Sequence, residues 1–233
     1  MNIIITGASR GFGKSIAEKF AHHGHQLFLC SRNEVSLYKA MEELMAKFPA
    51  VTIKAKPYDL SQKQSAKDFG NWILSLGIQI DVLINNAGQF IPGSVYNEDD
   101  GVLEKMLDIN LSSAYHLTRT LLPSMMQQKS GHIFNICSIA SLKAYPNGGA
   151  YSISKFAMLG FSRNLRHEMM PHGIKVTAVC PGAAMTDSWE GFDNSQHRIM
   201  ESEDISEMIY ASTQLSKQAV VEDIILRPQL GDL

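Results

Sequence analysis

The sequence predicts an α/β protein with a doubly wound, mostly parallel seven-stranded sheet and helices on both faces. Strand-like and helix-like stretches alternate along the chain, and this order requires crossover connections between parallel strands. The strand-like runs at 2–6, 81–85 and 174–180 are apolar almost throughout, as expected for strands covered on both faces. A glycine-rich turn directly after the first strand is a third indication of this fold class.

Each expected element follows from a local pattern. The expected strands are short apolar runs, and they cover residues 2–6, 26–30, 51–55, 81–85, 132–137, 174–180 and 223–226. The expected helices carry apolar residues at helical spacing, and they cover residues 12–23, 34–48, 62–76, 99–127, 150–170 and 203–215. We expect Gly24 to cap the end of the first helix, and Asn33 and Ser61 to cap the starts of the second and third.

Composition and charge limit the classes of function. A chain of 233 residues with 45% hydrophobic and 19% charged residues suits a single domain over residues 1–233, and no linker divides it. A formal charge of −2 gives no basic field for nucleic acid or a membrane surface, and the apolar runs are too short to span a bilayer. We therefore expect neither nucleic acid nor membrane as a partner.

The start of the chain and its cysteines indicate the compartment. The sequence begins directly on a strand, which leaves no room for a signal peptide, so we expect a cytoplasmic protein. Cys30, Cys137 and Cys180 lie in apolar strand-like runs. We expect buried, reduced thiols and no metal site.

The turn at residues 6–13 reads TGASRGFG and lies between the first strand and the first helix. In a doubly wound, or Rossmann, fold this turn meets the pyrophosphate of a dinucleotide, which glycines and the helix N-terminus accommodate. The spacing GxxxGxG is compatible with a merely flexible turn, but its position after a strand favours a nucleotide site. The predicted cofactor contacts in this turn are Gly7, Ser9, Arg10, Gly11, Phe12 and Gly13.

The end of the second strand indicates which nicotinamide cofactor is bound. An NAD site would carry Asp or Glu here for the ribose 2′-hydroxyl. This chain has Ser31 and Arg32 instead, and Arg32 could pair with a 2′-phosphate, with Arg10 as a second cation. The alternative is two solvated arginines. We predict that NADP(H) is preferred and that NAD(H) is the less favoured cofactor.

Residues at the ends of two further strands also suit a ligand site at the carboxyl edge of the sheet. Asn85, Asn86, Ala87 and Gly88 follow the fourth strand. They could form a simple turn, but at the carboxyl edge of the sheet they would line the ligand crevice. After the third strand, Asp59 and Leu60 could contact the adenine, although a helix-capping role for Asp59 is nearly as well supported.

Ser138, Tyr151 and Lys155 form the candidate catalytic group. Tyr151 and Lys155 stand at i and i+4 on an expected helix and so share one face. An ammonium next to a phenol favours the phenolate, which allows proton exchange near neutral pH. Ser138, at the end of an apolar run, could direct its hydroxyl into the same cleft. Such a tyrosine and lysine pair occurs on many helix surfaces, but the nucleotide features upstream favour a proton-transfer site.

The chain resembles the short-chain dehydrogenase/reductase family over nearly its whole length. The matching elements, in order, are TGASRGFG, Asp59, NNAG at 85–88, Asn110, Ser138, YSISK at 151–155, and Pro181-Gly182 followed by Thr186. The resemblance implies that Tyr151 is the general acid and base, and that Ser138 polarises the substrate carbonyl. It also implies that Lys155 holds the nicotinamide ribose and that Asn110 anchors a water.

The resemblance further implies that Pro181, Gly182 and Thr186 contact the cofactor. Two features depart from the family pattern. Cys137 replaces a serine found in many members, and the ending ILRPQLGDL lacks the glycine-rich end of the family's 3-oxoacyl-carrier-protein reductases. The expected activity is therefore an NADPH-dependent oxidoreductase that interconverts a carbonyl compound and its alcohol, with no substrate assigned. The alternative is a non-catalytic NADP(H)-binding sensor or scaffold protein on the same fold.

The sequence also allows predictions about the substrate pocket and the oligomeric state. We expect a short substrate-binding segment at about 185–202, and Lys143 and Arg198 are the possible clamps for a substrate carboxylate. The expected pocket walls are mostly apolar or aromatic, namely Ile139, Tyr145, Gln89, Phe90, Met185, Trp189 and Phe192. The helices at 99–127 and 150–170 carry apolar residues on more than one face, namely Leu107, Leu111, Tyr115 and Leu122 on the first and Phe156, Leu159 and Phe161 on the second. This pattern, with the pairing of these helices in related enzymes, predicts a homodimer or homotetramer.

Overall fold

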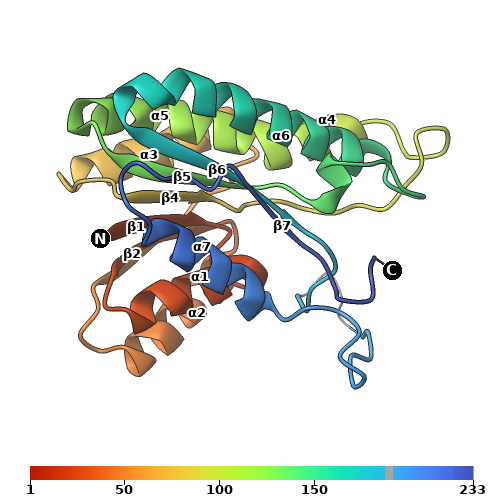
Figure 1. The fold of residues 1–233 in the computed structure, drawn as a ribbon, viewed down its shortest axis with the longest axis horizontal. Coiled ribbons are helices and arrows are strands. Elements are labelled where there is room, and N and C mark those ends of the chain that lie inside the picture. The colour runs from red at the N-terminus through yellow and green to blue at the C-terminus, as the bar shows by residue number, and fades with distance from the viewer. Residues whose placement is uncertain (187–190, 233) are drawn as a thin grey trace.

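The computed structural model describes residues 1–186 and 191–232 as three layers, a central sheet between two layers of helices (Figure 1). The seven strands are β1 (Asn2–Thr6), β2 (Gln26–Ser31), β3 (Ile53–Pro57), β4 (Val82–Asn85), β5 (Gly131–Ile136), β6 (Ile174–Pro181) and β7 (Asp223–Leu226). Their order in the sheet is β3-β2-β1-β4-β5-β6-β7, and each neighbouring pair is parallel. The predicted doubly wound fold is thus confirmed, with a fully parallel sheet.

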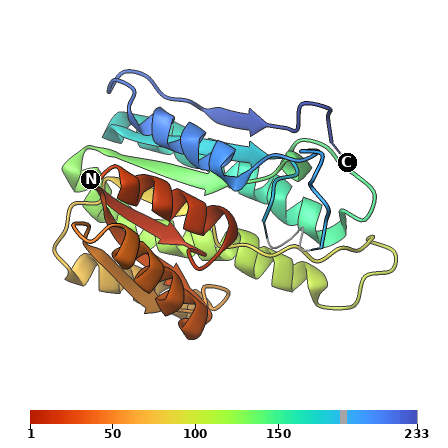
Figure 2. The same ribbon diagram turned by 90° about the horizontal axis from the view of Figure 1, so that it is seen from below.

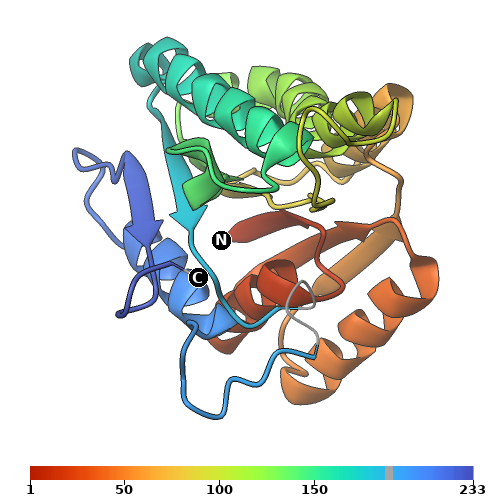
Figure 3. The same cartoon turned by 90° about the vertical axis from the view of Figure 1, so that its right-hand side faces the viewer.

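Helices cover both faces of this sheet. The helices are α1 (Gly11–His22), α2 (Glu34–Lys47), α3 (Lys63–Ser75), α4 (Val102–Leu107), α5 (Ser113–Gln128), α6 (Gly149–Met169) and α7 (Ser202–Thr213). The layer with α1, α2 and α7 lies below the sheet in Figure 1 and faces the viewer in Figure 2. Figure 3 shows the other layer, with α4, α5 and α6, on the opposite side. Within the described ranges, no helix has the length and apolar character needed to cross a membrane.

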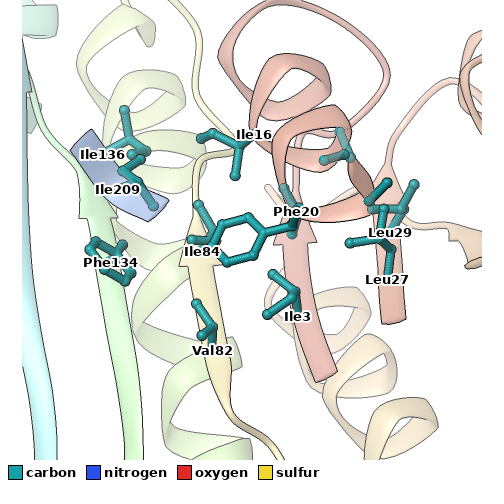
Figure 4. Packing of buried hydrophobic residues seen from close by; sticks show 14 of the residues in the cluster. Ile3, Ile16, Phe20, Leu27, Leu29, Val82, Ile84, Phe134, Ile136 and Ile209 are labelled. Atoms are coloured by element: carbon teal, nitrogen blue, oxygen red, sulfur yellow. The ribbon is translucent and has the colours of Figure 1, made fainter. Parts of the chain in front are cut away.

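The core explains why the strand sequences are so uniformly apolar. On β1, Ile3 and Ile5 belong to one hydrophobic cluster and Ile4 to another, and all three are completely buried. Figure 4 shows the first cluster, in which Phe20 of α1 packs among side chains of the central strands. Alternate residues of a strand point to opposite faces, so a central strand needs apolar residues at every position. The rigid core fixes the carboxyl ends of β1 and β4 side by side, where the strand order reverses.

Most expected boundaries agree with the structure to within two residues, which is the usual uncertainty at helix and strand ends. Asn33 caps α2 as predicted, because its side-chain oxygen accepts the N–H of Ser36 at 2.9 Å. α1 ends at His22, and Gly24 follows in the left-handed conformation with φ +74°. This conformation suits glycine, as expected just beyond a helix end.

β3 is shifted by two residues from its expected position, and the cap expected for α3 was wrong. β3 begins at Ile53 because Val51 still belongs to the turn after α2. Ser61 does not cap α3, which begins at Lys63. The N–H and hydroxyl of Ser61 both donate to the Asp59 carboxylate, so the capping chemistry is used in the turn before the helix.

The long helix expected at 99–127 is divided. It starts at Val102, after Gly101 with φ +86°, and a π-helical segment at Asp108–Ser112 separates α4 from α5. Such segments are rare and occur often at functional sites. Asn110 lies inside this one and is almost completely buried. The interruption therefore places a polar side chain in the interior near the end of β4.

Candidate active site

A cleft of about 1580 Å³ follows the carboxyl edge of the sheet. Most of the predicted site residues line it: Gly7, Ser9, Arg10, Gly11, Phe12, Ser31, Arg32, Asp59, Leu60, Asn86, Ala87, Gly88, Ser138, Tyr151, Lys155, Pro181, Gly182 and Thr186. Gly13 and Asn110 are predicted site residues that do not appear in its wall. The fold thus brings together, at one edge, residues that come from both halves of the chain.

The glycine turn is packed too closely to accept side chains. A Cβ added to Gly13 would lie 2.2 Å from the carbonyl oxygen of Gly7, and one added to Gly7 would lie 2.9 Å from the Asn86 amide nitrogen. Gly7 and Gly11 also have positive φ angles of +65° and +51°. α1 begins at Gly11, so N–H groups that lack intrahelical acceptors lie beside the cleft. This arrangement suits a phosphate group.

Thr6 and Asn86 join the end of β4 to the glycine turn. The Thr6 hydroxyl accepts the N–H groups of Asn86 and Ala87, both at 2.9 Å. The Asn86 amide donates to the carbonyl oxygens of Thr6 at 2.9 Å and Gly7 at 3.1 Å. The side chain of Asn86 therefore holds two parts of the cleft floor together, and its amide hydrogens are engaged within the protein.

Basic and hydroxyl side chains surround the end of β2. The stretch from Cys30 to Asn33 contains no carboxylate, and Arg32 is exposed and lines the cleft. Sequence reasoning missed Lys39, which lines the same region from α2. The sequence feature that could have identified Lys39 is the helical spacing of Ser36, Lys39 and Glu43, which places these residues on one side of α2.

Glu43 is the acidic side chain of α2 that reaches the cleft. It is hydrogen-bonded to Lys14. This contact lowers the pKa of the Glu43 carboxyl, so it remains ionised and paired at neutral pH. Arg10, Arg32 and Lys39 leave the region with more basic than acidic side chains.

Asp59 combines a local role with a place in the cleft. Its Oδ1 accepts the N–H of Ser61 at 3.2 Å and the Ser61 hydroxyl at 2.8 Å. The carboxylate thus shapes the turn before α3 without capping the helix, whose N-cap is Gln62, and it lines the cleft, where the adenine contact stays a prediction. Tyr58, which sequence reasoning did not select, lines the cleft beside it.

Lys155 and Tyr151 come from the first turns of α6. The Lys155 ammonium is buried, donates to the carbonyl oxygen of Ile136 at 2.8 Å, and lies 5.8 Å from the centre of the Tyr151 ring. The Tyr151 ring meets the ring of Phe90 edge-on, with 4.9 Å between centroids. The helical spacing therefore places the ammonium and the phenol together at the end of β5, as predicted.

Ser138 is held with its hydroxyl oxygen already engaged. It caps a short 3₁₀ helix at Ile139–Ser141, where its Oγ accepts the N–H of Ala140 at 3.1 Å. The Ser141 hydroxyl in turn accepts the N–H of Ser138 at 3.1 Å. Because the Ser138 oxygen accepts a backbone N–H, its O–H remains able to donate to a group in the cleft.

Asn110 fastens two segments to each other behind the cleft wall. Its Oδ1 accepts the N–H of Gln89 at 2.8 Å. Its Nδ2 donates to the Gln89 carbonyl at 3.0 Å and to the Ser154 hydroxyl at 2.9 Å. The side-chain amide is thus engaged with protein groups through both its oxygen and its nitrogen.

The three cysteines are free and buried. Cys137 lines the cleft next to Ser138, and its sulfur lies 3.9 Å from the Ser162 hydroxyl. The two thiols Cys137 and Cys180 influence each other, so that the pKa of Cys137 is lowered and the pKa of Cys180 is raised. Cys137, which departs from the family pattern, therefore has a polar neighbour in Ser162.

The other end of the cleft has aromatic and apolar walls. Gln89, Phe90, Ile139 and Tyr145 line it as predicted. In the part of the chain that the structure describes, Met185 and Phe192 are not among the lining residues, and Trp189 lies outside that part. Burial and the nearby Tyr151 raise the pKa of Tyr145 to about 12, so its phenol stays protonated near neutral pH.

Lys143 and Arg198, the possible carboxylate clamps, are both bound to the C-terminal segment. Lys143 pairs with Asp232 at 2.8 Å, and Arg198 donates to the carbonyl oxygens of Gly231 and Asp232 at 3.0 and 3.2 Å. Asp232 also lines the cleft and pairs with Arg227. No local signal could have identified the pairing of Asp232 with Lys143, because these two residues lie far apart in the sequence.

Comparison with known proteins gives a consistent result. The short chain dehydrogenase family model matches residues 1–197. An uncharacterized oxidoreductase of Staphylococcus epidermidis is 29% identical over 226 residues, which cover 97% of this chain and 96% of the relative.

Solved structures resemble this chain over almost its full length. The alcohol dehydrogenase of the archaeon Thermococcus sibiricus, complexed with 5-hydroxy-NADP, is 26% identical with a TM-score of 0.89, covering 98% of this chain and 96% of that one. A closed form of serine dehydrogenase complexed with NADP+ is 25% identical with a TM-score of 0.89, covering 100% and 97%. The chain therefore belongs to the short-chain dehydrogenase/reductase family and is an oxidoreductase of that family.

Proposed function

We propose that this oxidoreductase interconverts a carbonyl compound and its alcohol with NADP(H), using Ser138, Tyr151 and Lys155. One observation carries the proposal. A buried ammonium, a phenol and a serine hydroxyl that is free to donate lie at the same end of one cleft. The other end of that cleft has the glycine turn and basic side chains that suit a dinucleotide phosphate.

The residues present fit NADP(H) better than NAD(H). The close packing of Gly7 and Gly13 and the start of α1 would hold the pyrophosphate, with Ser9 and Phe12 beside them. Arg32, together with Arg10, Ser31 and Lys39, would hold a 2′-phosphate, and no carboxylate stands at the end of β2 to repel it. The two solved relatives described above are complexes with NADP compounds, which supports the same choice.

When bound, the nicotinamide supplies a hydride to the carbonyl carbon and receives one in the reverse direction. In the proposed reduction, Ser138 donates a hydrogen bond to the carbonyl oxygen and so stabilises the negative charge that develops there. Tyr151 then gives its phenolic proton to that oxygen. The Lys155 ammonium, held by the Ile136 carbonyl, stabilises the phenolate that remains and would also contact the nicotinamide ribose.

Other predicted residues have supporting roles in this proposal. Asn110 would anchor a water through an oxygen acceptor, while its amide keeps Gln89 and Ser154 in place. Gly88 lies close to both Asn110 and Lys155, because a Cβ added there would be 3.0 Å from Asn110 Oδ1 and 3.6 Å from Lys155 Nζ. Pro181, Gly182 and Thr186 would close the cofactor site from the β6 side.

The substrate end of the cleft supports a neutral carbonyl compound of small or medium size. Phe90, Ile139 and Tyr145 supply apolar and aromatic surface. Lys143 lines the cleft but is paired with Asp232, and Arg198 donates to the C-terminal carbonyl oxygens, so a substrate carboxylate would have to compete with these contacts. We propose that residues 1–233 form one domain containing both the cofactor and the substrate sites, with substrate contacts from the segment at about 185–202.

Exposed apolar residues on two helices support a homodimer or homotetramer. Tyr115 on α5, and Ile153 and Phe156 on α6, are 38%, 44% and 46% exposed. Leu159 and Phe161 were expected on the same surface, but both pack against a buried cluster of this chain. A cytoplasmic location stays a prediction.

Turnover across a panel of uncharged ketones and aldehydes tests the proposed function. The expected result is consumption of NADPH, in preference to NADH, with at least one of these carbonyl compounds. NADPH binding without turnover of any carbonyl or alcohol would instead support the sensor or scaffold interpretation.

A further inference from the structure

Glu98 contacts the helix that carries the proposed catalytic residues, although it lies outside the cleft. Its Oε2 accepts the N–H of Ala150 at 3.1 Å, and Ala150 directly precedes Tyr151. The first N–H groups of a helix have no intrahelical acceptor and lie at the positive end of the helix dipole. Gly148, at the N-cap of α6, offers no side chain to satisfy them. Glu98 therefore supplies from another part of the chain the capping group that α6 lacks.

The segment that contains Glu98 is also bound to the turn before α6. The N–H of Gly93 donates to the Asn147 carbonyl at 3.2 Å, and the Ser94 hydroxyl donates to the Asn147 side chain at 3.2 Å. A Cβ added to Gly149 would lie 2.5 Å from the Gly93 carbonyl oxygen and 2.6 Å from Glu98 Oε2. The two segments thus touch so closely that only glycine fits at position 149.

The same segment is attached to α6 on the other side of Tyr151. Gln89 is bound through its backbone to Asn110, which also donates to the Ser154 hydroxyl on α6. Between these attachments the Phe90 ring meets the Tyr151 ring. Residues 89–98 are therefore fastened to α6 both before and after Tyr151, with Glu98 as the charged contact.

We propose that Glu98 is a positioning residue that fixes the start of α6 and so keeps Tyr151 and Lys155 in place relative to Ser138. Tyr151 is adjacent to the bonded N–H of Ala150, so a shift of this turn moves the phenol directly. A displacement of about 1 Å in a catalytic group can reduce a rate by about 10²-fold. This inference rests on the proposed function, because it assigns to Glu98 the alignment of that same catalytic group.

Three substitutions at Glu98 separate the hydrogen bond from the charge. Glu98→Ala removes both, Glu98→Gln keeps an oxygen that can accept the Ala150 N–H, and Glu98→Asp keeps the charge but shortens the reach. Asp81→Ala is a matched control, since the Asp81 carboxylate accepts the N–H of Asn2 at 2.7 Å near the start of β4, away from the cleft. For each variant we would measure kcat and KM for a carbonyl substrate, the NADPH Kd, the Tm, and amide hydrogen exchange in residues 148–156.

The expected result is a loss confined to turnover. In Glu98→Ala, kcat should fall by about 10- to 100-fold while the NADPH Kd stays within about twofold, and exchange at residues 148–156 should accelerate. Glu98→Gln should recover kcat to within about threefold of the parent and Glu98→Asp should not, because only the first keeps the bond. Asp81→Ala should leave kcat and the exchange of this peptide unchanged.

Several results would overturn the inference. One is a kcat in Glu98→Ala or Glu98→Asp that matches the parent. Another is a kcat in Glu98→Gln no higher than that in Glu98→Ala. A third is a loss of kcat in Asp81→Ala as large as that in Glu98→Ala. If the parent turns over no carbonyl, the proposed function fails, but hydrogen exchange still tests whether Glu98 holds the start of α6. Unchanged exchange in Glu98→Ala and Glu98→Asp would then contradict it. If Glu98→Ala does not fold, the Gln and Asp variants make the same comparison.

Discussion

The two ends of the cleft are built in different ways. At the glycine turn the contacts offered to a ligand are mostly backbone groups of one short sequence, Gly7 to Gly13, which Asn86 holds in place from the end of β4. At the catalytic end the groups offered are side chains, and residues far away in the sequence hold them. Lys155 is bound to Ile136 of β5, and Glu98 is bound to the start of α6. The groups of the proposed phosphate site thus come from one short sequence, whereas the proposed proton-transfer groups come from several elements and are aligned by tertiary contacts.

Substitution of Lys155 should have the largest effect on activity, because we assign this residue both a role in proton transfer and a contact with the cofactor. Lys155→Met keeps much of the buried volume but removes the ammonium and leaves the Ile136 carbonyl without its donor. We expect kcat to fall by roughly 10²–10⁴, the usual contribution of positioned acid and base catalysis, together with weaker NADPH binding. Steady-state kinetics and NADPH titration would check both effects. A variant that loses turnover but binds NADPH as tightly as the parent would restrict Lys155 to the catalytic end.

Gly13→Ala tests the close packing at the glycine turn. The new Cβ would meet the Gly7 carbonyl at 2.2 Å, and overpacking of this kind usually costs about 1–3 kcal/mol. We expect the strained turn to move away from the shape that suits a phosphate, so the NADPH affinity should fall by about 10- to 100-fold, which corresponds to about 1.4–2.8 kcal/mol of binding free energy. The control is Gly160→Ala in α6, where a Cβ meets nothing within 4 Å, so NADPH affinity should not change. Equal affinities in both variants would contradict the proposed phosphate contact.

A smaller effect is expected at the end of β2. Arg32→Asp replaces a favourable phosphate contact by repulsion, so the ratio of kcat/KM for NADPH over NADH should fall by about 10- to 100-fold. Lys54→Asp makes the same change of charge on the exposed side of β3, outside the cleft, and should leave the ratio nearly unchanged. If Arg32→Asp retains the parent's preference, the proposed 2′-phosphate site is wrong.

The comparison also explains which features could be predicted from sequence. The alternation of apolar runs was sufficient for the fold, because central strands buried on both faces have a distinct composition. The Asn33 cap and the spacing of Tyr151 and Lys155 depend only on neighbouring residues. The structure places Tyr151 and Lys155 together in the cleft, as that spacing predicted.

Features that depend on distant contacts could not be predicted. The π-helical segment around Asn110 interrupts an otherwise helical pattern where Asn110 bonds Gln89 and Ser154. Lys143 looked available to bind a carboxylate because its partner, Asp232, lies near the other end of the chain. No residue near Glu98 in the sequence indicates its contact with α6, since the helix that it caps begins some fifty residues later.

Tyr151→Phe is the most direct test of the proposed mechanism. The substitution removes one hydroxyl, keeps the ring that packs against Phe90, and leaves Lys155 and the glycine turn in place. With the preferred carbonyl substrate, we expect kcat to fall by roughly 10²–10⁴ while the NADPH Kd and the Tm stay close to those of the parent. A Tyr151→Phe enzyme with near-normal turnover would show that the proton comes from another group and would contradict the mechanism.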